Sequence, residues 1–176
     1  MATINIQIAV DAATLAEQVQ DGSISAGSVG SPTYLGSYTS SDVYICMITQ
    51  SGNVNNNTQG ESELSVSANG GDTLEWAMTT FDNNDDYTAF LYAGNFTPAS
   101  AMTALTYIAP QTTIYLPPSG NPTGTLTAYT NQTSFAQATV IQTNLSVQYN
   151  LSFIVVNNKN GTVVGYFYWD PFIAVS

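Results

Sequence analysis

The sequence predicts an all-β protein, a single-domain antiparallel β-sandwich with at most a short helix near the N-terminus. Short segments that alternate hydrophobic and polar side chains are separated by clusters of Gly, Asn, Ser and Pro. The chain is 44% hydrophobic and 11% aromatic, which is enough to bury a core. No internal repeat and no break in composition divides it, so residues 1–176 are expected to form one domain.

The N-terminal part of the chain contains two predicted strands and the expected helix. Residues 4–10 alternate hydrophobic and polar side chains, which predicts a half-buried strand. Asp11 is a favourable N-cap for a short helix over residues 12–19. After a long loop rich in Gly and Ser, residues 42–49 are expected to form a hydrophobic strand. Cys46 in that strand is expected to be a buried free thiol.

The middle of the chain is predicted to contain a hairpin and several short strands. Residues 64–68 alternate, and the turn sequence Asn69–Asp72 then leads into a returning strand with Trp76 on its hydrophobic face. The segment 102–108 is compatible with either a strand or a helical turn. Further β-prone segments lie at 88–92, 112–116, 123–129 and 136–142.

The C-terminal strand over residues 162–169 has the densest aromatic content and follows a long predicted strand at 147–156. Asn160-Gly161 between them is a type I′ turn signal. Both faces of the aromatic strand are bulky, so we expect it to be central in its sheet, with Trp169 in the core. Pro171 should end regular pairing, and Asp170 is placed to accept a hydrogen bond from a Tyr or Trp.

Charge restricts the partners of this protein. It has one Lys or Arg against twelve Asp and Glu, no His, and a net charge of −11. A chain with a single cation cannot neutralise phosphates, so we expect no nucleic acid and no anionic membrane surface as partners. The first residues lack the basic and apolar regions of a secretory signal, and no segment has the length of a membrane span. A cytoplasmic protein is therefore expected.

Catalytic residue patterns are scarce. Without His there is no Ser-His-Asp or Cys-His arrangement, and zinc loses a common ligand. Cys46 has no cationic neighbour in sequence to lower its thiol pKa. Two carboxylates can in principle catalyse glycoside hydrolysis, but no pair of carboxylates is marked out by the sequence. We therefore expect no enzymatic activity.

The acidic segment 81–87 is the candidate metal site. Asp82, Asn84 and Asp86 follow one another at every second position, the spacing that opens an EF-hand loop. Tyr87 replaces the required Gly and Ala93 the bidentate Glu, so the segment is not an EF-hand. On an extended segment the three side chains would share one side, and together with Asp85 they are candidate Ca²⁺ ligands. A solvated acidic turn is the alternative.

A sugar site beside this loop is the accompanying hypothesis. Calcium can leave coordination positions for vicinal hydroxyls, and aromatic rings can pack on the apolar face of a sugar. On this basis Asn83, Trp76 and Tyr87 are the candidate sugar-binding residues.

Several segments, in order along the chain, resemble the AidA/PixA inclusion body protein family. They are Met47–Val54, Gly60–Leu64, Gly71–Trp76, Thr79-Thr80, Ala89–Tyr92 and Gly165–Ile173. The last, Gly-Tyr-Phe-Tyr-Trp-Asp-Pro-Phe-Ile, is the most specific. In this family Arg often flanks the Trp that follows Gly-Asp-Thr, whereas Glu75 and Ala77 stand there in this chain.

The resemblance implies a small bacterial protein, which in some relatives accumulates as crystalline cytoplasmic inclusions. It implies links to host association and to sugar binding, and it transfers no catalytic residue. Two hypotheses follow. One is a non-catalytic, calcium-assisted carbohydrate-binding module, and the other is a storage or self-assembling inclusion body protein without a specific ligand. Both are compatible with a homo-oligomer or larger assembly, because a surface with one Lys and few Glu loses little side-chain entropy in ordered contacts.

Overall fold

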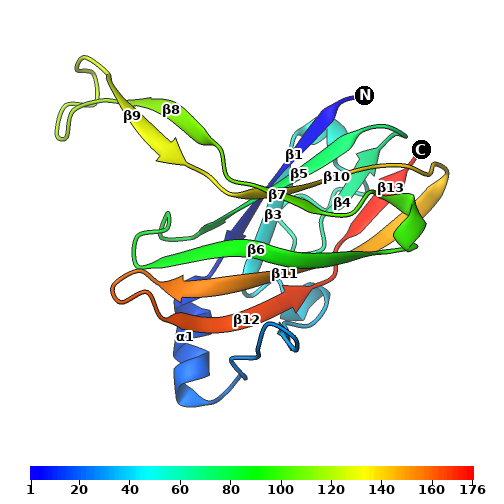
Figure 1. Ribbon diagram of the computed structural model, residues 1–176, viewed down its shortest axis with the longest axis horizontal. Coiled ribbons are helices and arrows are strands. Elements are labelled where there is room, and N and C mark those ends of the chain that lie inside the picture. The colour runs from blue at the N-terminus through cyan, green and yellow to red at the C-terminus, as the bar shows by residue number, and fades with distance from the viewer.

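Two β-sheets pack against each other in the structure, a computed structural model that describes residues 1–176 (Figure 1). The five-stranded sheet has the order β3-β1-β5-β10-β7. Its strands are β1 (Thr3–Val10), β3 (Ile45–Thr49), β5 (Thr73–Thr80), β7 (Thr106–Ile108) and β10 (Phe135–Thr139). The all-β prediction is confirmed, but the predicted antiparallel pairing is not uniform, because β1 and β5 run parallel.

The six-stranded sheet is built around its longest strand, β11. On one side β11 pairs with β6, and on the other it pairs with β12 and then, beyond Pro171, with β13. The short strands β2 and β4 add in parallel to β12 and β13. The bounds are β2 (Thr33–Tyr34), β4 (Ser65–Ala68), β6 (Tyr87–Thr97), β11 (Leu145–Asn157), β12 (Val163–Trp169) and β13 (Phe172–Val175).

One α-helix lies at an end of the sandwich. It is α1 (Ala12–Asp21), and the Asp11 side chain accepts a hydrogen bond from the Thr14 N–H at 3.0 Å, which confirms the predicted cap. Leu15 on its inner side is wholly buried. Short 3₁₀ turns occur at η1 (Tyr38–Ser40), η2 (Ser51–Asn53) and η3 (Ala99–Ala101). None of these helices is long and apolar enough to cross a membrane.

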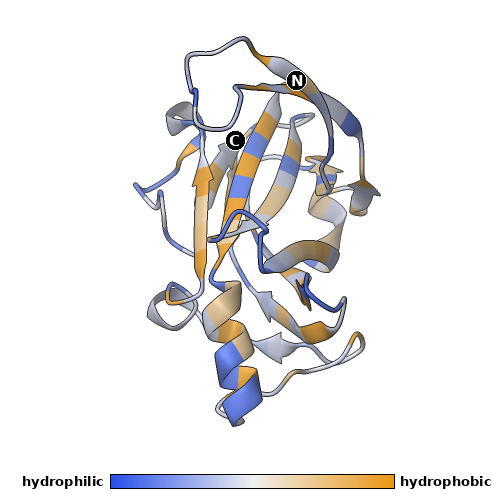
Figure 2. Ribbon diagram, turned by 90° about the vertical axis from the view of Figure 1, so that its left-hand side faces the viewer, coloured by the Kyte–Doolittle hydropathy of each residue, from blue (hydrophilic) through white to orange (hydrophobic).

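The core lies between the two sheets and follows the alternation of the strands, which also appears as hydrophobic and hydrophilic bands in Figure 2. Trp76 of β5 meets Tyr149 of β11, with ring centroids 5.4 Å apart. Trp169 meets Phe153 edge to face at 5.6 Å, and its Nε1 donates to the carbonyl of Ser62 at 2.9 Å. Trp169 is 0% exposed, which confirms its predicted position in the core.

A two-stranded arm projects from the body (Figure 1). It consists of β8 (Gln111–Leu116) and β9 (Thr127–Gln132), which pair only with each other. The arm continues the β7–β10 pair beyond Pro110, whose carbonyl accepts from Thr133 N–H at 3.2 Å. All of its strand residues are exposed.

Three local predictions are corrected by the strand pairing. The turn at Asn69–Asp72 forms, but β4 and β5 belong to different sheets, so it is a connection between layers and not a hairpin. The β11–β12 hairpin is present, yet of Asn160-Gly161 only Gly161 has a positive φ, so its turn is not type I′. Cys46 points to the outer face of β3 and is only partly buried, because its neighbours Ile45 and Met47 take the inner face.

The aromatic strand β12 is fully buried on one face only. Its inner side chains Phe167 and Trp169 are buried, whereas Tyr166 and Tyr168 on the outer face are partly exposed. The central strand of this sheet is β11, since β12 has only the two-residue β2 on its far side. The expectation of a strand buried on both faces is therefore wrong, and a row of tyrosines remains accessible outside.

Candidate functional site

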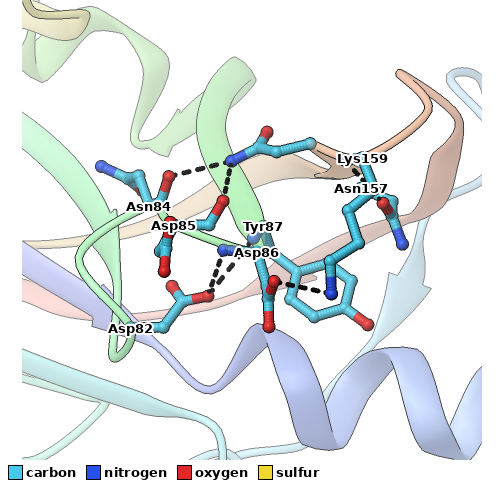
Figure 3. A network of polar contacts seen from close by, with 8 residues as sticks. Asp82, Asn84, Asp85, Asp86, Tyr87, Asn157 and Lys159 are labelled. Carbon is cyan, nitrogen blue, oxygen red and sulfur yellow. Dashed lines mark hydrogen bonds and ion pairs between the residues drawn. The ribbon is translucent and has the colours of Figure 1, made fainter.

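The acidic segment 81–87 forms a turn, and not the extended strand on which we placed its side chains. Asn83 and Asn84 adopt left-handed backbone conformations, with φ of 57° and 62°. The Asp82 carboxylate accepts from the N–H of Asp86 at 2.9 Å and of Tyr87 at 3.3 Å (Figure 3). It also accepts from the Thr80 hydroxyl. Asp82 therefore holds the turn closed from inside.

The electrostatics of the turn follow from these contacts. Burial acts to raise the pKa of Asp82, but hydrogen bonds from Thr80 and from backbone N–H groups outweigh it and hold that pKa below its ordinary value. Asp86 pairs with Lys159 at 2.8 Å. The side-chain amide of Asn158 donates to the carbonyls of Asn84 and Asp85 at 2.9 and 3.0 Å, which ties the turn to the β11–β12 hairpin.

These contacts bear on the predicted calcium ligands. The structure has no group of three or more His, Cys, Asp or Glu side chains placed to hold a metal ion. Asp82 and Asn84 face Thr80, Asp86 faces Lys159, and Asp85 is exposed on the turn. Calcium binding by these four residues stays a prediction.

The predicted sugar-binding residues are not gathered in one place. Trp76 is 0% exposed and its Nε1 donates to the Tyr149 hydroxyl at 3.2 Å inside the core. It has no face to offer to a ligand, so its assignment is corrected. Side chains alternate along β5, so Trp76 points into the core and its neighbours point outward. The same alternation is visible in the sequence and could have indicated that Trp76 is buried. Asn83 is exposed on the acidic turn, whereas Tyr87 is the first residue of β6 and is partly buried against the core.

A groove on the outer face of the six-stranded sheet is a more structured candidate. It has a cavity volume of about 380 Å³, and we call it the Asp170 groove. Its side chains come from four strands and the residue after β12: Tyr34, Thr97, Gln148, Asn150, Tyr168 and Asp170. Gln148 and Asn150 alternate with buried residues of β11, which directs both side chains outward.

Asp170 is the hydrogen-bonding centre of this groove. One carboxylate oxygen accepts from the Tyr34 hydroxyl at 2.7 Å, and the other from the Gln148 amide at 3.0 Å. Because Tyr34 and Tyr168 are register partners on β2 and β12, their rings stack with centroids 4.9 Å apart. Burial, with a contribution from Asp170, raises the pKa of the Tyr34 phenol to about 12, so Tyr34 remains a donor at neutral pH.

The groove combines a carboxylate, two amides and an aromatic pair on a rigid sheet. A carboxylate has four acceptor positions, and Asp170 uses only part of them. The Gln148 amide retains one donor and its acceptor, and the Asn150 amide retains both donors, because its oxygen already accepts from Asn95 at 3.4 Å. Such groups can bind a ligand that presents several hydroxyls. The sequence indicated part of this site, since Tyr166, Tyr168 and Asp170 alternate and Asp170 was expected to accept from a Tyr. Tyr34 and Gln148 had no sequence signal, because they reach the groove only through strand pairing.

Comparisons with known proteins agree with this architecture. The family model described as PixA: Inclusion body protein matches residues 2–175. The crystal structure of the inclusion body protein PixA from Burkholderia cenocepacia J2315 superposes with a TM-score of 0.77 at 17% identity, over 99% of this chain and 96% of that one. The solution structure of Amebosin gives a TM-score of only 0.28 at 10% identity, over 72% and 93% of the two chains. No curated protein matches the sequence.

Proposed function

Because the chain belongs to the PixA inclusion body protein family, we propose that it is a non-catalytic protein whose copies pack together into ordered inclusions in the cytoplasm. The observation that carries this proposal is the distribution of charge. Between Asp86 and Lys159 the sequence has no Asp, Glu, Lys or Arg, and all twelve acids lie outside that segment. The chain segment from β6 to β11 therefore contributes no charged side chain to the surface.

An uncharged surface favours contact between copies for two physical reasons. Ordering a Lys or Glu side chain costs up to about 2 kcal/mol of rotamer entropy, and this region has neither. The repulsion between two molecules that each carry −11 is weakest where they meet through their uncharged parts. Salt should reduce the remaining repulsion, because the Debye length falls to about 10 Å at 0.1 M.

Sedimentation velocity and light scattering across a salt series test this proposal. We expect monomer at low salt and progressively larger species as salt rises, because screening removes the long-range repulsion and leaves the short-range contacts. A chain that remains monomeric from low to high salt at every concentration would contradict assembly as its function.

Saccharide binding at the Asp170 groove is a second proposal, favoured by the stacked Tyr34–Tyr168 pair beside the Asp170 carboxylate. Sugar hydroxyls would donate to Asp170 and exchange hydrogen bonds with Gln148 and Asn150. A glycan array tests it, with Tyr168→Ala and Asp170→Asn as variants. Ser146→Ala, on the same strand but outside the groove, is the control. Equal signals from all four proteins, or none from the unmodified chain, would reject this second function.

Calcium binding at the acidic turn is a separate proposal, because the turn and the Asp170 groove lie at opposite ends of the β6–β11 pair. Asp82, Asp85 and Asp86 bring three like charges close together, and a bound divalent cation would relieve their repulsion. The glycan array is also run with calcium and with chelator, which measures whether calcium affects sugar binding at all. A signal that is equal in both conditions would separate sugar binding from calcium.

A further inference from the structure

The β8–β9 arm exposes hydrophobic side chains on a ribbon that nothing else in the chain covers. On one of its faces Ile114 lies opposite Tyr129, and Leu116 follows two residues later. These side chains are 36%, 49% and 46% exposed. An isolated two-stranded ribbon is at best marginally stable in water, and further packing is what normally stabilises it.

The arm also lacks the features that usually keep exposed strands apart. Charged side chains on edge strands prevent pairing between molecules, and the arm has none. Pro110, Pro117 and Pro118 flank β8 but do not interrupt it, so both strands present free backbone edges. A segment of this kind is suited to contact with another protein surface.

A groove of matching character lies beside β6. It has a cavity volume of about 480 Å³ and is lined mainly by hydrophobic residues of β6 and of the segment from η3 to β7. Those that the argument uses are Tyr92, Phe96, Met102, Leu105 and Tyr107. No charged side chain lines it, whereas three other surface grooves contain Glu75, Asp170 or Glu63. A groove beside the start of β6 also lacks charge, but it is lined mostly by polar residues and does not match the hydrophobic face of the arm.

The distribution of charge favours a second copy of this chain as the partner. The arm and the β6 groove both lie in the uncharged segment between Asp86 and Lys159, so neither offers an ion pair to a charged partner. Two copies that meet through these surfaces keep their acidic parts outside the contact. Since arm and groove are different surfaces, each copy can donate an arm and accept one.

We propose that the β8–β9 arm of one copy docks with its Ile114–Tyr129 face in the β6 groove of a second copy. This inference rests on the assembly proposed above and names the contact that produces it. Such a contact is heterologous, and unless the rotation between copies closes a ring, it continues from copy to copy without limit. Open-ended growth of this kind would produce an inclusion and not only a dimer.

Paired variants test the two sides of the contact. Ile114→Lys puts a charge on the docking face of the arm, and Thr113→Lys puts the same charge on its opposite face. Tyr107→Lys changes the groove, and Thr106→Lys changes the neighbouring residue, which lies outside the groove. We expect the Ile114 and Tyr107 variants to need about tenfold or more higher concentration to assemble, and both controls to assemble like the unmodified chain.

Mixing distinguishes this contact from a symmetric arm-to-arm dimer. Ile114→Lys retains an intact groove and Tyr107→Lys an intact arm, so together they should form one-to-one complexes that grow no further. If Tyr107→Lys assembles normally while Ile114→Lys does not, the arm binds elsewhere and the groove assignment is overturned. Circular dichroism verifies the fold of each variant, and Ile114→Asn replaces Ile114→Lys if the latter unfolds.

Two further outcomes separate this inference from the function on which it rests. If the unmodified chain assembles and both the Ile114 and Tyr107 variants assemble equally well, the arm contact is wrong while assembly stands. If the unmodified chain remains monomeric at all salt concentrations, the proposed function fails and the arm contact falls with it.

Discussion

Tyr34 donates its phenolic hydrogen to Asp170 at 2.7 Å, although the two residues are 136 positions apart in the sequence. The contact joins the short strand β2 to the end of β12, where the aromatic sequence turns into β13. It also fixes the carboxylate at the centre of the Asp170 groove. The orientation of the proposed saccharide site therefore depends on a segment that sequence analysis placed in a loop.

We predict a measurable coupling between these two residues. A double-mutant cycle with Tyr34→Phe and Asp170→Asn should give a coupling free energy of about 1 kcal/mol. A hydrogen bond to a charged group is stabilising, but Tyr34 is 44% exposed, so water competes for its hydroxyl and reduces the coupling. Urea denaturation of the four proteins measures it. Additive effects of the two substitutions would mean that the hydrogen bond is not maintained in solution.

Glu63 should make the stability of the fold fall as pH rises. It is 2% exposed, and burial raises its pKa, although the N–H of Tyr38 donates to it at 2.7 Å and partly opposes the shift. The unfolded chain releases this proton near the ordinary carboxyl value of about 4.3, before the folded chain does, so above that pH the folded state loses stability.

The Glu63→Gln variant removes this titration and retains an oxygen to accept from Tyr38. Its stability relative to the unmodified chain should increase from about pH 4.5 to about pH 7, because only the unmodified chain has the Glu63 carboxyl to ionise there. Urea denaturation at both pH values measures the difference. An equal difference at the two values would show that Glu63 ionises alike in the folded and unfolded chains.

Trp169→Ala should destabilise the fold by about 3–5 kcal/mol. The indole is wholly buried against Phe153, and its removal leaves a cavity and an unpartnered carbonyl at Ser62. Guanidinium denaturation followed by far-UV circular dichroism measures the change. A loss below about 1 kcal/mol would be incompatible with a buried indole.

Gly165→Ala tests how closely the chain segments approach each other on β12. A Cβ at this position would lie 2.6 Å from the Phe167 ring and 2.9 Å from the carbonyl of Ala26, so we expect a loss of about 1–3 kcal/mol. Gly30→Ala is the matched control, since its Cβ would meet nothing within 4 Å. Thermal melting measures both variants, and the melting midpoint should fall for Gly165→Ala only. Equal midpoints for the two variants would contradict the close packing at Gly165.

Calcium should raise the melting temperature if the acidic turn binds it. A ligand present at a hundred times its dissociation constant stabilises the folded state by about 2.7 kcal/mol. Asp82→Ala with Asp86→Ala should abolish the effect, but Asp82 also holds the turn, so Asp85→Asn is the variant with the smaller structural change. Melting with calcium and with chelator measures it, and coincident curves would exclude calcium.

Much of the local structure was predictable because neighbouring residues encode it. The alternation of residues 4–10 gave β1, the Asp11 side chain gave the start of α1, and Pro171 marked the break between β12 and β13. The candidate site was predicted less well. Periodicity placed Tyr168 and Asp170 on one face, but it could not show that Trp76 was needed in the core or that Tyr34 would join them.

Sequence patterns were enough to predict the class of fold, the family and the position of most strands, and they set the charge. Three features became visible only in the folded chain: β4 and β5 separate into different sheets, Tyr34 meets Asp170, and the β8–β9 arm projects from the body with its residues exposed. The physical reason is that side-chain period and turn chemistry act between near neighbours. The choice of pairing partner depends instead on which hydrophobic faces can be buried together across the whole chain.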